Sequence, residues 1–292
     1  MSKWSIGFTM GLLACTSDPV DTDLPVETDV VDTQDSDTDG LQVDQFTFTA
    51  VAWNLESGGS EIETLADTVA VVEGEAIWAF CEVQDSTWAD SLGQAAADQE
   101  SFLNFEYVFG TTGYEDRLVI AWDQEVFDKL DDYELDDINV GGTARAPLVV
   151  HFEVIATGDQ FLFMVNHLWR SENEYRHEQA DMLNEWVSEQ TLPVIAMGDY
   201  NFDWDVVDGE EDHDEGYDLM TALDRWTWVR PDPLEETHCS SYNSVLDFAF
   251  VSPTVLDWAP VSEILTPDPD WCPDGPEQSD HRPVSIQVSI PQ

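Results

Sequence analysis

Positive charge is scarce in this sequence. The chain of 292 residues has nine lysine and arginine residues against 62 aspartate and glutamate residues, a formal net charge of −53 at neutral pH. Lysine occurs only at Lys3 and Lys129, a scarcity typical of adaptation to saline surroundings. Proteins that bind nucleic acid without sequence preference rely on clustered lysine and arginine, so a broad basic groove is excluded.

Several familiar signatures are also missing. There is no glycine-rich phosphate loop and no dinucleotide-binding fingerprint, which excludes the common nucleotide-binding motifs. There is no internal repeat, which excludes a solenoid or a propeller. The spacing of the four cysteines fits no zinc-finger pattern. Any function must therefore be read from shorter clusters of polar residues.

The N-terminal segment indicates export. An apolar run at 4–14, preceded by Lys3, is too short to span a bilayer as a mature helix but long enough for a signal-peptide core. It ends in Leu-Leu-Ala-Cys at 12–15, which resembles the bacterial lipobox, where the cysteine is lipidated and becomes the new N-terminus. Ordinary signal cleavage nearby, with Cys15 irrelevant, is the alternative. We expect a protein held in the cell envelope by a lipid anchor on Cys15, at the outer membrane or cell surface, or else secreted.

Residues 16–45 form a distinct stretch, rich in aspartate, threonine, valine and proline and without lasting apolar periodicity. Such a segment cannot bury enough surface to offset its ordering entropy, so we expect a disordered acidic linker. Ten of the 62 acidic residues and one of the nine basic residues lie in 1–45, which leaves 52 and eight in 46–292. The folded part therefore carries about −44 and should repel polyanions at low salt.

From residue 46 onward, strand-like and helix-like stretches alternate without a second linker, which indicates one domain over 46–292. Apolar and β-branched runs predict strands, and apolar residues at helical spacing predict helices. The expected strands are 46–53, 76–83, 105–109, 117–122, 148–155, 161–167, 193–197, 245–251 and 284–290, and the expected helices are 62–72, 87–97 and 172–190. Strands at hairpin spacing mixed with helices favour an α/β domain of sheets covered by helices.

Three cysteines and one acidic run lie within this domain. Cys239 and Cys272 lie in loop-like, polar and proline-rich sequence of an exported chain, so we expect a disulfide between them. Cys81 lies in an apolar run and is expected to be a buried thiol. Nine of the sixteen residues in 203–218 are acidic, but the pattern is not that of an EF-hand loop. A solvated charge run is favoured there over a calcium site.

Polar side chains follow or interrupt several apolar strands. The segments are Trp-Asn-Leu-Glu at 53–56, Phe-Cys-Glu-Val at 80–83, Val-Asn-His-Leu at 165–168, Gly-Asp-Tyr-Asn at 198–201, Leu-Asp-Phe at 246–248 and Ser-Asp-His at 279–281. Strands that end at a cleft deliver polar groups there, and an acid inside an apolar strand, such as Asp247, should have a partner. An Asp–His pair with Asp-x-Asn supplies a metal ligand, a general base and an amide donor, which metal-assisted phosphoryl hydrolysis needs.

In order and spacing, these six segments resemble the endonuclease/exonuclease/phosphatase superfamily, which has the DNase I-like fold. The resemblance covers residues 46–290 and rests on the six together, because each alone occurs often by chance. It implies a four-layer α/β sandwich, two mixed β-sheets packed face to face with helices outside. It also implies a metal-dependent phosphoester hydrolase, which we expect to be a monomer without a protein partner.

The resemblance implies the ligands of a divalent ion. Glu82 is similar to the main ligand, although a lone glutamate at a strand end is by default a surface residue. Asn54 and Glu56 match the first motif, with Asn54 oriented toward metal and phosphate, and Asp280 matches the second ligand region. Carboxylate oxygens without a thiolate favour Mg²⁺, Mn²⁺ or Ca²⁺ over zinc.

The resemblance also implies catalytic roles. His281 is similar to the general base that takes a proton from the attacking water, with Asp247 holding its other ring nitrogen. His167 matches a second histidine of the nuclease and phosphodiesterase branches, which donates to a phosphate oxygen or to the leaving group. Asp199 and Asn201 would position the water and stabilise charge on the phosphoryl oxygens.

Basic residues near such a site are candidates for binding the substrate phosphate. Arg145 matches an arginine with this role in the nuclease branch, and a surface arginine that satisfies local acids is an equal alternative. Arg117 and Arg170 are weaker candidates of the same kind. The remaining histidines match no motif: His151, His177, His213 and His238.

Three interpretations follow. A nuclease-type phosphodiesterase ranks first because His167 and Arg145 match that branch. A phosphatase or phosphodiesterase acting on small phosphoesters, inositol phosphates or phospholipid head groups ranks second, favoured by the acidic surface. A catalytically inactive surface-displayed binding protein on the same scaffold would usually have lost a motif residue, and none is missing here.

Overall fold

The computed structural model describes residues 45–292 apart from 73, 99–103, 240–242 and 268–277, and the described residues lie in one compact unit, Val43–Gln292. The strands are β1 (Gln45–Asn54), β2 (Ile77–Val83), β3 (Phe105–Phe109), β4 (Arg117–Asp123), β5 (Phe127–Glu134), β6 (Leu148–Val154), β7 (Gln160–His167), β8 (Val194–Asp205), β9 (Thr227–Trp228), β10 (Ser244–Val251), β11 (Val261–Ile264) and β12 (Val284–Pro291). The helices are α1 (Ile62–Val69), α2 (Ser86–Asp98), α3 (Asn173–Ser188) and α4 (Glu215–Thr221), with short 3₁₀ helices at Asp136–Ile138, Val140–Gly142, Ala222–Asp224 and Pro253–Trp258. No helix in the described part is both long and apolar enough to cross a membrane.

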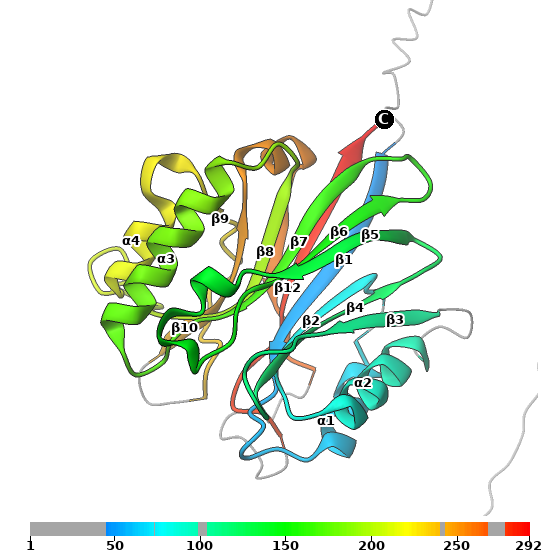
Figure 1. Ribbon diagram of the computed structural model, residues 1–292, viewed down its shortest axis with the longest axis horizontal. Coiled ribbons are helices and arrows are strands. Elements are labelled where there is room, and N and C mark those ends of the chain that lie inside the picture. The colour runs from blue at the N-terminus through cyan, green and yellow to red at the C-terminus, as the bar shows by residue number, and fades with distance from the viewer. Residues whose placement is uncertain (1–44, 73, 99–103, 240–242, 268–277) are drawn as a thin grey trace, which may run out of the picture. The chain divides into compact units, whose positions relative to one another are not determined.

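The strands form two mixed sheets of six strands each (Figure 1). The first has the order β11-β12-β1-β2-β4-β3, and the second has the order β5-β6-β7-β8-β10-β9. Within each sheet one central pair is parallel, β1 with β2 and β7 with β8, and the other neighbours are antiparallel. Each parallel pair brings the C-terminal ends of two strands to the same edge of its sheet.

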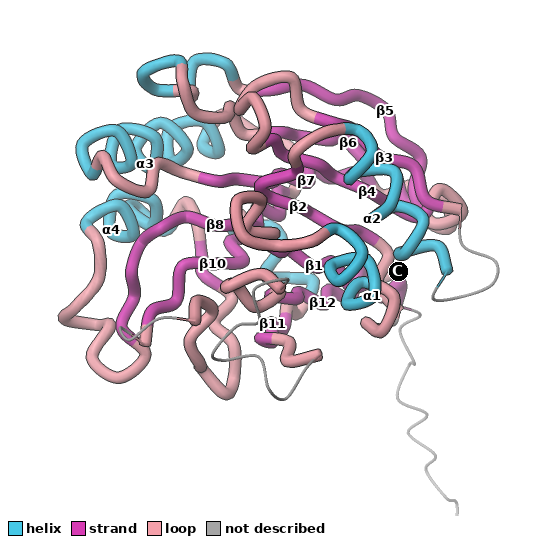
Figure 2. The backbone as a smooth tube through the Cα atoms, turned by 90° about the horizontal axis from the view of Figure 1, so that it is seen from below, coloured by secondary structure: helices cyan, strands magenta, loops and turns pink. Residues whose placement is uncertain are grey.

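Alternation along the strands explains the layers. In β1, Ala50 and Ala52 belong to the apolar cluster between the two sheets, whereas Val51 and Trp53 pack with α1 and α2. In the second sheet, alternate residues of β7, β8 and β10 pack in the same way against α3 and α4. The helices thus cover the outer faces of the two sheets (Figures 1 and 2). This confirms the predicted four-layer α/β sandwich.

The expected elements are found with shifted ends, and four further elements were not predicted: β5, β9, β11 and α4. Strand β5 was missed because its residues 128–131 are exposed at a sheet edge and three of these four residues are charged. Strand β8 extends to Asp205 instead of ending near Met197, because Tyr200, Phe202 and Trp204 continue the buried alternation. The Gly-Asp-Tyr-Asn segment therefore lies within a strand and not beyond its end.

The acidic run 203–218 is only partly the solvated stretch that its composition predicts. Glu210 and Glu211 are exposed, but the Asp214 side chain is 8% exposed and pairs with Arg176 at 2.6 Å and His177 at 3.0 Å. Burial opposes the charged form, but these hydrogen bonds lower the pKa of Asp214. The prediction of a solvated run is wrong for Asp214, which also caps α4 by accepting from the Gly216 amide.

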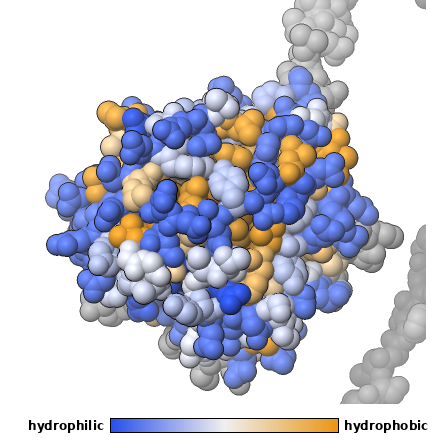
Figure 3. Space-filling model, viewed as in Figure 1, coloured by the Kyte–Doolittle hydropathy of each residue, from blue (hydrophilic) through white to orange (hydrophobic). Residues whose placement is uncertain are grey.

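The expectations for the cysteines and for the N-terminal segment have different outcomes. Cys81 is a buried free thiol, as predicted, and donates to the Asn166 carbonyl at 3.2 Å. Cys15, the linker 16–44 and Cys272 lie outside the described residues, so lipidation, linker disorder and the Cys239–Cys272 disulfide stay predictions. Hydrophilic side chains cover most of the face in Figure 3, in keeping with the acidic composition.

Candidate active site

Side chains from both sheets meet at one edge of the sandwich. Asn54 ends β1, Glu82 lies beside the end of β2, and His167 ends β7 opposite Asp199 of β8. Asn54 joins the two sheets, because its Nδ2 donates to Glu82 Oε1 at 3.3 Å and to Asp199 Oδ2 at 2.9 Å. Of these four residues, Asn54, His167 and Asp199 are buried. The structure therefore brings together residues that lie up to 145 positions apart.

Gly198 allows β8 to approach β7 closely beside this centre. Its φ is 129°, and a Cβ atom added there would lie 2.1 Å from the carbonyl oxygen of Asn166. Only glycine avoids that clash in this conformation. The close approach places Asp199 beside His167, with 3.5 Å between Asp199 Oδ2 and His167 Nε2.

His281 and Asp247 form a buried pair. His281 Nδ1 lies 2.7 Å from Asp247 Oδ2, and the two residues are 6% and 2% exposed. The His281 backbone is braced, because its amide donates to Ser279 Oγ and its carbonyl accepts from Trp53 Nε1. Burial opposes a charged imidazole, but Asp247, then Asp199 and Asp280, raise the pKa of His281 to about 10. The ring is oriented with Nε2 on the side away from Asp247, as a general base requires.

Asp199 lies on the other side of the His281 ring. Its Oδ2 is 3.9 Å from His281 Nε2, and its Oδ1 accepts from the Asn201 backbone amide at 2.9 Å. Burial raises the pKa of Asp199 to about 7, with a further contribution from Asp247. Asp199 thus lies close to His281, and its role in positioning the attacking water stays a prediction.

Glu82 has the surroundings of a metal ligand. Its backbone is left-handed, with φ of 63°, where the pairing of β2 with β4 becomes irregular. Its carboxylate accepts from the Ser57 amide at 3.1 Å and from Asn54. Burial, followed by repulsion from Asp116, raises the pKa of Glu82. A divalent cation would relieve that repulsion, and the hard oxygen donors fit Mg²⁺, Mn²⁺ or Ca²⁺.

The other two predicted metal-site residues are Glu56, in the loop after β1, and Asp280, in the loop before β12. Glu56 accepts the Asp280 backbone amide at 2.9 Å through its carboxylate, so it braces this loop. Asp280 lies between two imidazoles, with 3.0 Å from its Oδ2 to His238 Nε2 and 3.7 Å from its Oδ1 to His281 Nε2. Asp280, His238 and His281 form a group able to hold a cation, whereas Glu82 is in no such group among the described residues.

Arg145 lies beside His167 and is paired with a local acid. Its Nη1 pairs with Asp116 Oδ2 at 2.9 Å, and its Nη2 lies 2.7 Å from His167 Nε2. Burial, followed by Arg145, lowers the pKa of His167 well below its ordinary value, so the ring is neutral. The pairing with Asp116 agrees with the interpretation of Arg145 as a partner of local acids, and its contact with a substrate phosphate stays a prediction.

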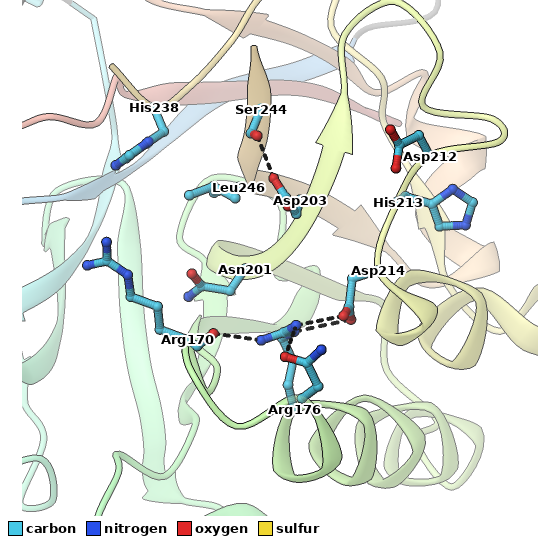
Figure 4. A pocket seen from close by; sticks show the side chains of 11 residues that line it. Arg170, Arg176, Asn201, Asp203, Asp212, His213, Asp214, His238, Ser244 and Leu246 are labelled. Atoms are coloured by element: carbon cyan, nitrogen blue, oxygen red, sulfur yellow. Dashed lines mark hydrogen bonds and ion pairs between the residues drawn. The ribbon is translucent and has the colours of Figure 1, made fainter. Parts of the chain in front are cut away.

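Two cavities border this centre and share Arg170. One, of about 580 Å³, reaches Glu82, His167 and Arg145. The other, of about 450 Å³, reaches Asn201 and His238 and is shown in Figure 4. Asn201, with φ of 53°, donates its Nδ2 to the Leu168 carbonyl at 3.3 Å, so its position at the cavity wall is fixed.

Sequence reasoning missed His238. An isolated antiparallel bridge pairs it with His281, and the two rings lie 4.9 Å apart. Two backbone hydrogen bonds of 2.7 Å flank the bridge, from Cys239 to Asp280 and from Arg282 to Thr237. No apolar strand precedes His238 in the sequence, so no local signal points to the site. The contact depends on a loop crossing that only the tertiary structure sets.

The fold is that of the endonuclease/exonuclease/phosphatase proteins. No family model matches the sequence, and no curated protein matches it either. An endonuclease/exonuclease/phosphatase family protein from Bacteroides thetaiotaomicron superposes with a TM-score of 0.63 at 18% identity, covering 85% of this chain and 96% of that one.

Two further solved structures with the same fold are named as specific proteins. A mannosyl-6-phosphatase from Bacteroides thetaiotaomicron gives a TM-score of 0.58 at 19% identity, covering 82% of this chain and 99% of that one. TDP2 from D. rerio, complexed with a single-strand DNA product, gives 0.62 at 13% identity, covering 82% and 98%. At such identities the likeness shows the shared fold alone, and these neighbours differ in substrate.

Proposed function

We propose that this protein is a divalent-metal-dependent phosphoester hydrolase, most specifically a nuclease-type phosphodiesterase. The observation that carries the proposal is the buried His281–Asp247 pair beside Asp199, joined through Asn54 to Glu82 of the other sheet. A candidate general base, its orienting carboxylate and oxygen ligands for a cation are thus linked through contacts of Asp199 and Asn54. An inactive binding protein would have no need of this buried, mutually repelling set of acids.

In the proposed reaction, the neutral form of His281, which a pKa of about 10 makes the minor form at neutral pH, takes a proton from the attacking water at Nε2. Asp247 holds Nδ1 and stabilises the imidazolium that forms, in keeping with the raised pKa of His281. Asp199 orients the water, and Asn54 and Asn201 offer hydrogen bonds to the phosphoryl oxygens. His167, as a neutral imidazole, can donate a hydrogen bond to the phosphate or to the leaving group.

A divalent ion would be held by Glu82, with Asn54 beside it and Asp280 on the facing loop. When bound, it supplies positive charge that offsets the negative charge of the phosphoryl oxygens in the transition state. The raised pKa of Glu82 supports this role, because a buried carboxylate near Asp116 gains from a cation.

Two cavities that border the centre and share Arg170 favour a diester, because the phosphorus of a diester carries two substituents that need space. The lining also favours a second candidate, a small phosphoester such as an inositol phosphate or a phospholipid head group. Glu115 and Asp116 line one cavity, and Asp203 and Asp212 line the other. Acids at these positions repel a polyanion along its length.

The test is hydrolysis by the purified protein with Mg²⁺, Mn²⁺ or Ca²⁺ of plasmid DNA, RNA, bis(p-nitrophenyl) phosphate and sphingomyelin. Glu82→Gln and His281→Gln should each lower the rate at least about a hundredfold. His151→Gln is the matched control, because His151 bonds to Gln160 and belongs to neither cavity. EDTA should abolish the activity. A folded His281→Gln variant with the wild-type rate would refute the mechanism.

The cellular location is a proposal of its own. We propose that the protein is exported and held at the cell envelope through a lipid on Cys15, since a signal-like apolar run and a lipobox-like segment precede the acidic linker. The domain would then act at the end of a long tether, where an extracellular phosphoester could reach it.

A further inference from the structure

Arg170 differs from every other basic residue in the described part of the chain. Eight lysine and arginine residues lie in 46–292, and seven have a hydrogen-bond or ion-pair partner. The pairs are Arg117–Tyr114, Lys129–Asp132, Arg145–Asp116, Arg176–Asp214, Arg225–Asn184, Arg230–Glu210 and Arg282–Glu235. The Arg170 guanidinium is exposed and has no such partner among the described residues.

An unpaired cation is unexpected in a domain of this composition. With 52 acidic residues available, an arginine without a functional constraint would be expected near a carboxylate, as its seven counterparts mostly are. An unpaired guanidinium keeps its five donors available in a planar fork, the geometry that binds a phosphate through two oxygens.

The position of Arg170 is as informative as its lack of a partner. It lies in the connection between His167, which ends β7, and α3, and it lines both cavities. Arg176 donates to the Arg170 carbonyl at 2.9 Å, which anchors the backbone while the side chain extends into the cavity on the side of Asn201 and His238 (Figure 4). Burial and Arg145 lower the pKa of His167, and His281 and then Arg170 act in the same direction.

We propose that Arg170 binds the scissile phosphate of the substrate from the cavity side, a role that rests on the proposed phosphoester hydrolysis. Arg145 is partly neutralised by Asp116, so Arg170 is the cation that remains for an incoming anion. Its place between the two cavities puts it beside a phosphate that spans them, with one substituent in each.

This arrangement also selects a class of substrate. One unpaired cation can match one phosphate, while the acids that line both cavities repel any further negative charge. The preferred substrate is therefore a phosphodiester whose two substituents are uncharged or cationic. A substrate with additional phosphates should be bound more weakly.

The experiment compares the full-length protein with Arg170→Gln, Arg170→Lys and the control Lys129→Gln, at saturating Mg²⁺. Lys129 is partly exposed on the edge strand β5, so its replacement removes the same charge away from both cavities. On bis(p-nitrophenyl) phosphate, which has one phosphate, Arg170→Gln should lower kcat/KM roughly 10- to 100-fold. Arg170→Lys should recover part of the loss, and Lys129→Gln should stay within about twofold of wild type.

A binding measurement separates this inference from the proposed function. Inorganic phosphate, titrated by calorimetry in the presence of Mg²⁺, should bind Arg170→Gln at least about tenfold more weakly than wild type or Lys129→Gln. This result does not require turnover, so it holds even if the protein hydrolyses none of the substrates. Equal phosphate affinity and equal kcat/KM in Arg170→Gln and Lys129→Gln, both folded by thermal melting, would overturn the assignment.

A second comparison tests the substrate class. Thymidylyl-thymidine should be cleaved faster than the same dinucleotide carrying a 5′-phosphate, and the ratio should fall as salt screens the acids. A preference for the phosphorylated dinucleotide would contradict the inferred class.

Discussion

Glu75 is a buried acid outside the candidate site, and its replacement should stabilise the protein in a pH-dependent way. Glu75 precedes β2, is 7% exposed, and its Oε2 has no hydrogen-bond partner in the described part of the chain. Burial, and then repulsion from Glu263, raises the pKa of Glu75 from 4.5 to about 7. The charged form is therefore disfavoured in the folded protein, and Glu75→Gln removes it.

The sign and size of the effect of Glu75 on the free energy of unfolding follow from proton linkage. Between pH 4.5 and about 7 the folded state holds the Glu75 proton more tightly than the unfolded state, so stability is lost as pH rises. Above about pH 7 this loss of stability is complete. A difference of about 2.5 between the two pKa values corresponds to about 3 kcal/mol. For a domain of this size that is a rise in Tm of roughly 6–12 °C for Glu75→Gln at pH 8.

Thermal unfolding of both proteins at pH 5 and pH 8 measures this effect. The gain in Tm from Glu75→Gln should be large at pH 8 and small at pH 5. Because the two proteins are compared at the same pH, the effects of other titrating groups on Tm cancel. Glu263→Gln, at an exposed position, should give a smaller gain in the same direction because it removes the second cause. Equal gains at both pH values, or no gain at pH 8, would show that Glu75 is not destabilising when charged.

Three further predictions concern the site, the chain and the surface. Asp247→Asn should lower kcat by about 10²- to 10⁴-fold, measured on bis(p-nitrophenyl) phosphate, because His281 loses the carboxylate that orients it and stabilises its charge; a loss below about tenfold would contradict the pairing. Cys239 and Cys272 should be joined by a disulfide worth on the order of 3 kcal/mol, which non-reducing peptide mapping decides, and two free thiols in protein from its native compartment would refute it. DNA cleavage at saturating metal should improve as ionic strength rises toward about 0.3–0.5 M, where the Debye length is about 5 Å, while a small phosphodiester changes little; strong cleavage at low salt that falls steeply would reveal a basic groove.

The anchoring prediction completes this set. Wild-type protein should partition with membranes, and Cys15→Ser should release it or block its processing. Recovery of the wild type wholly in the soluble fraction, with a mature N-terminus elsewhere, would argue against the lipobox.

The buried strands and the three longer helices could be predicted from the sequence, because an apolar run or an apolar stripe is a local property of the chain. The positions of Asn54, Glu82, His167 and His281 beside such runs are likewise visible in the sequence, and their metal-binding and catalytic roles stay predictions. Strand β5 could not be predicted, because its exposed charged middle hides the alternation on which such predictions depend. The extension of β8 past Gly198 was missed for a similar reason, since acids interrupt its apolar positions.

Only the tertiary structure decided which polar groups meet and which remain free. The sequence predicts that Asp247 needs a partner, but the 2.7 Å contact with His281 arises because the loop before β12 of the first sheet reaches β10 of the second. His238 reaches Asp280 through a loop crossing, and Arg145 is paired with Asp116 while Arg170 is not. Residue type and local pattern are set by the chain itself, whereas pairing depends on distances between segments far apart in sequence, and those distances exist only once the two sheets have packed.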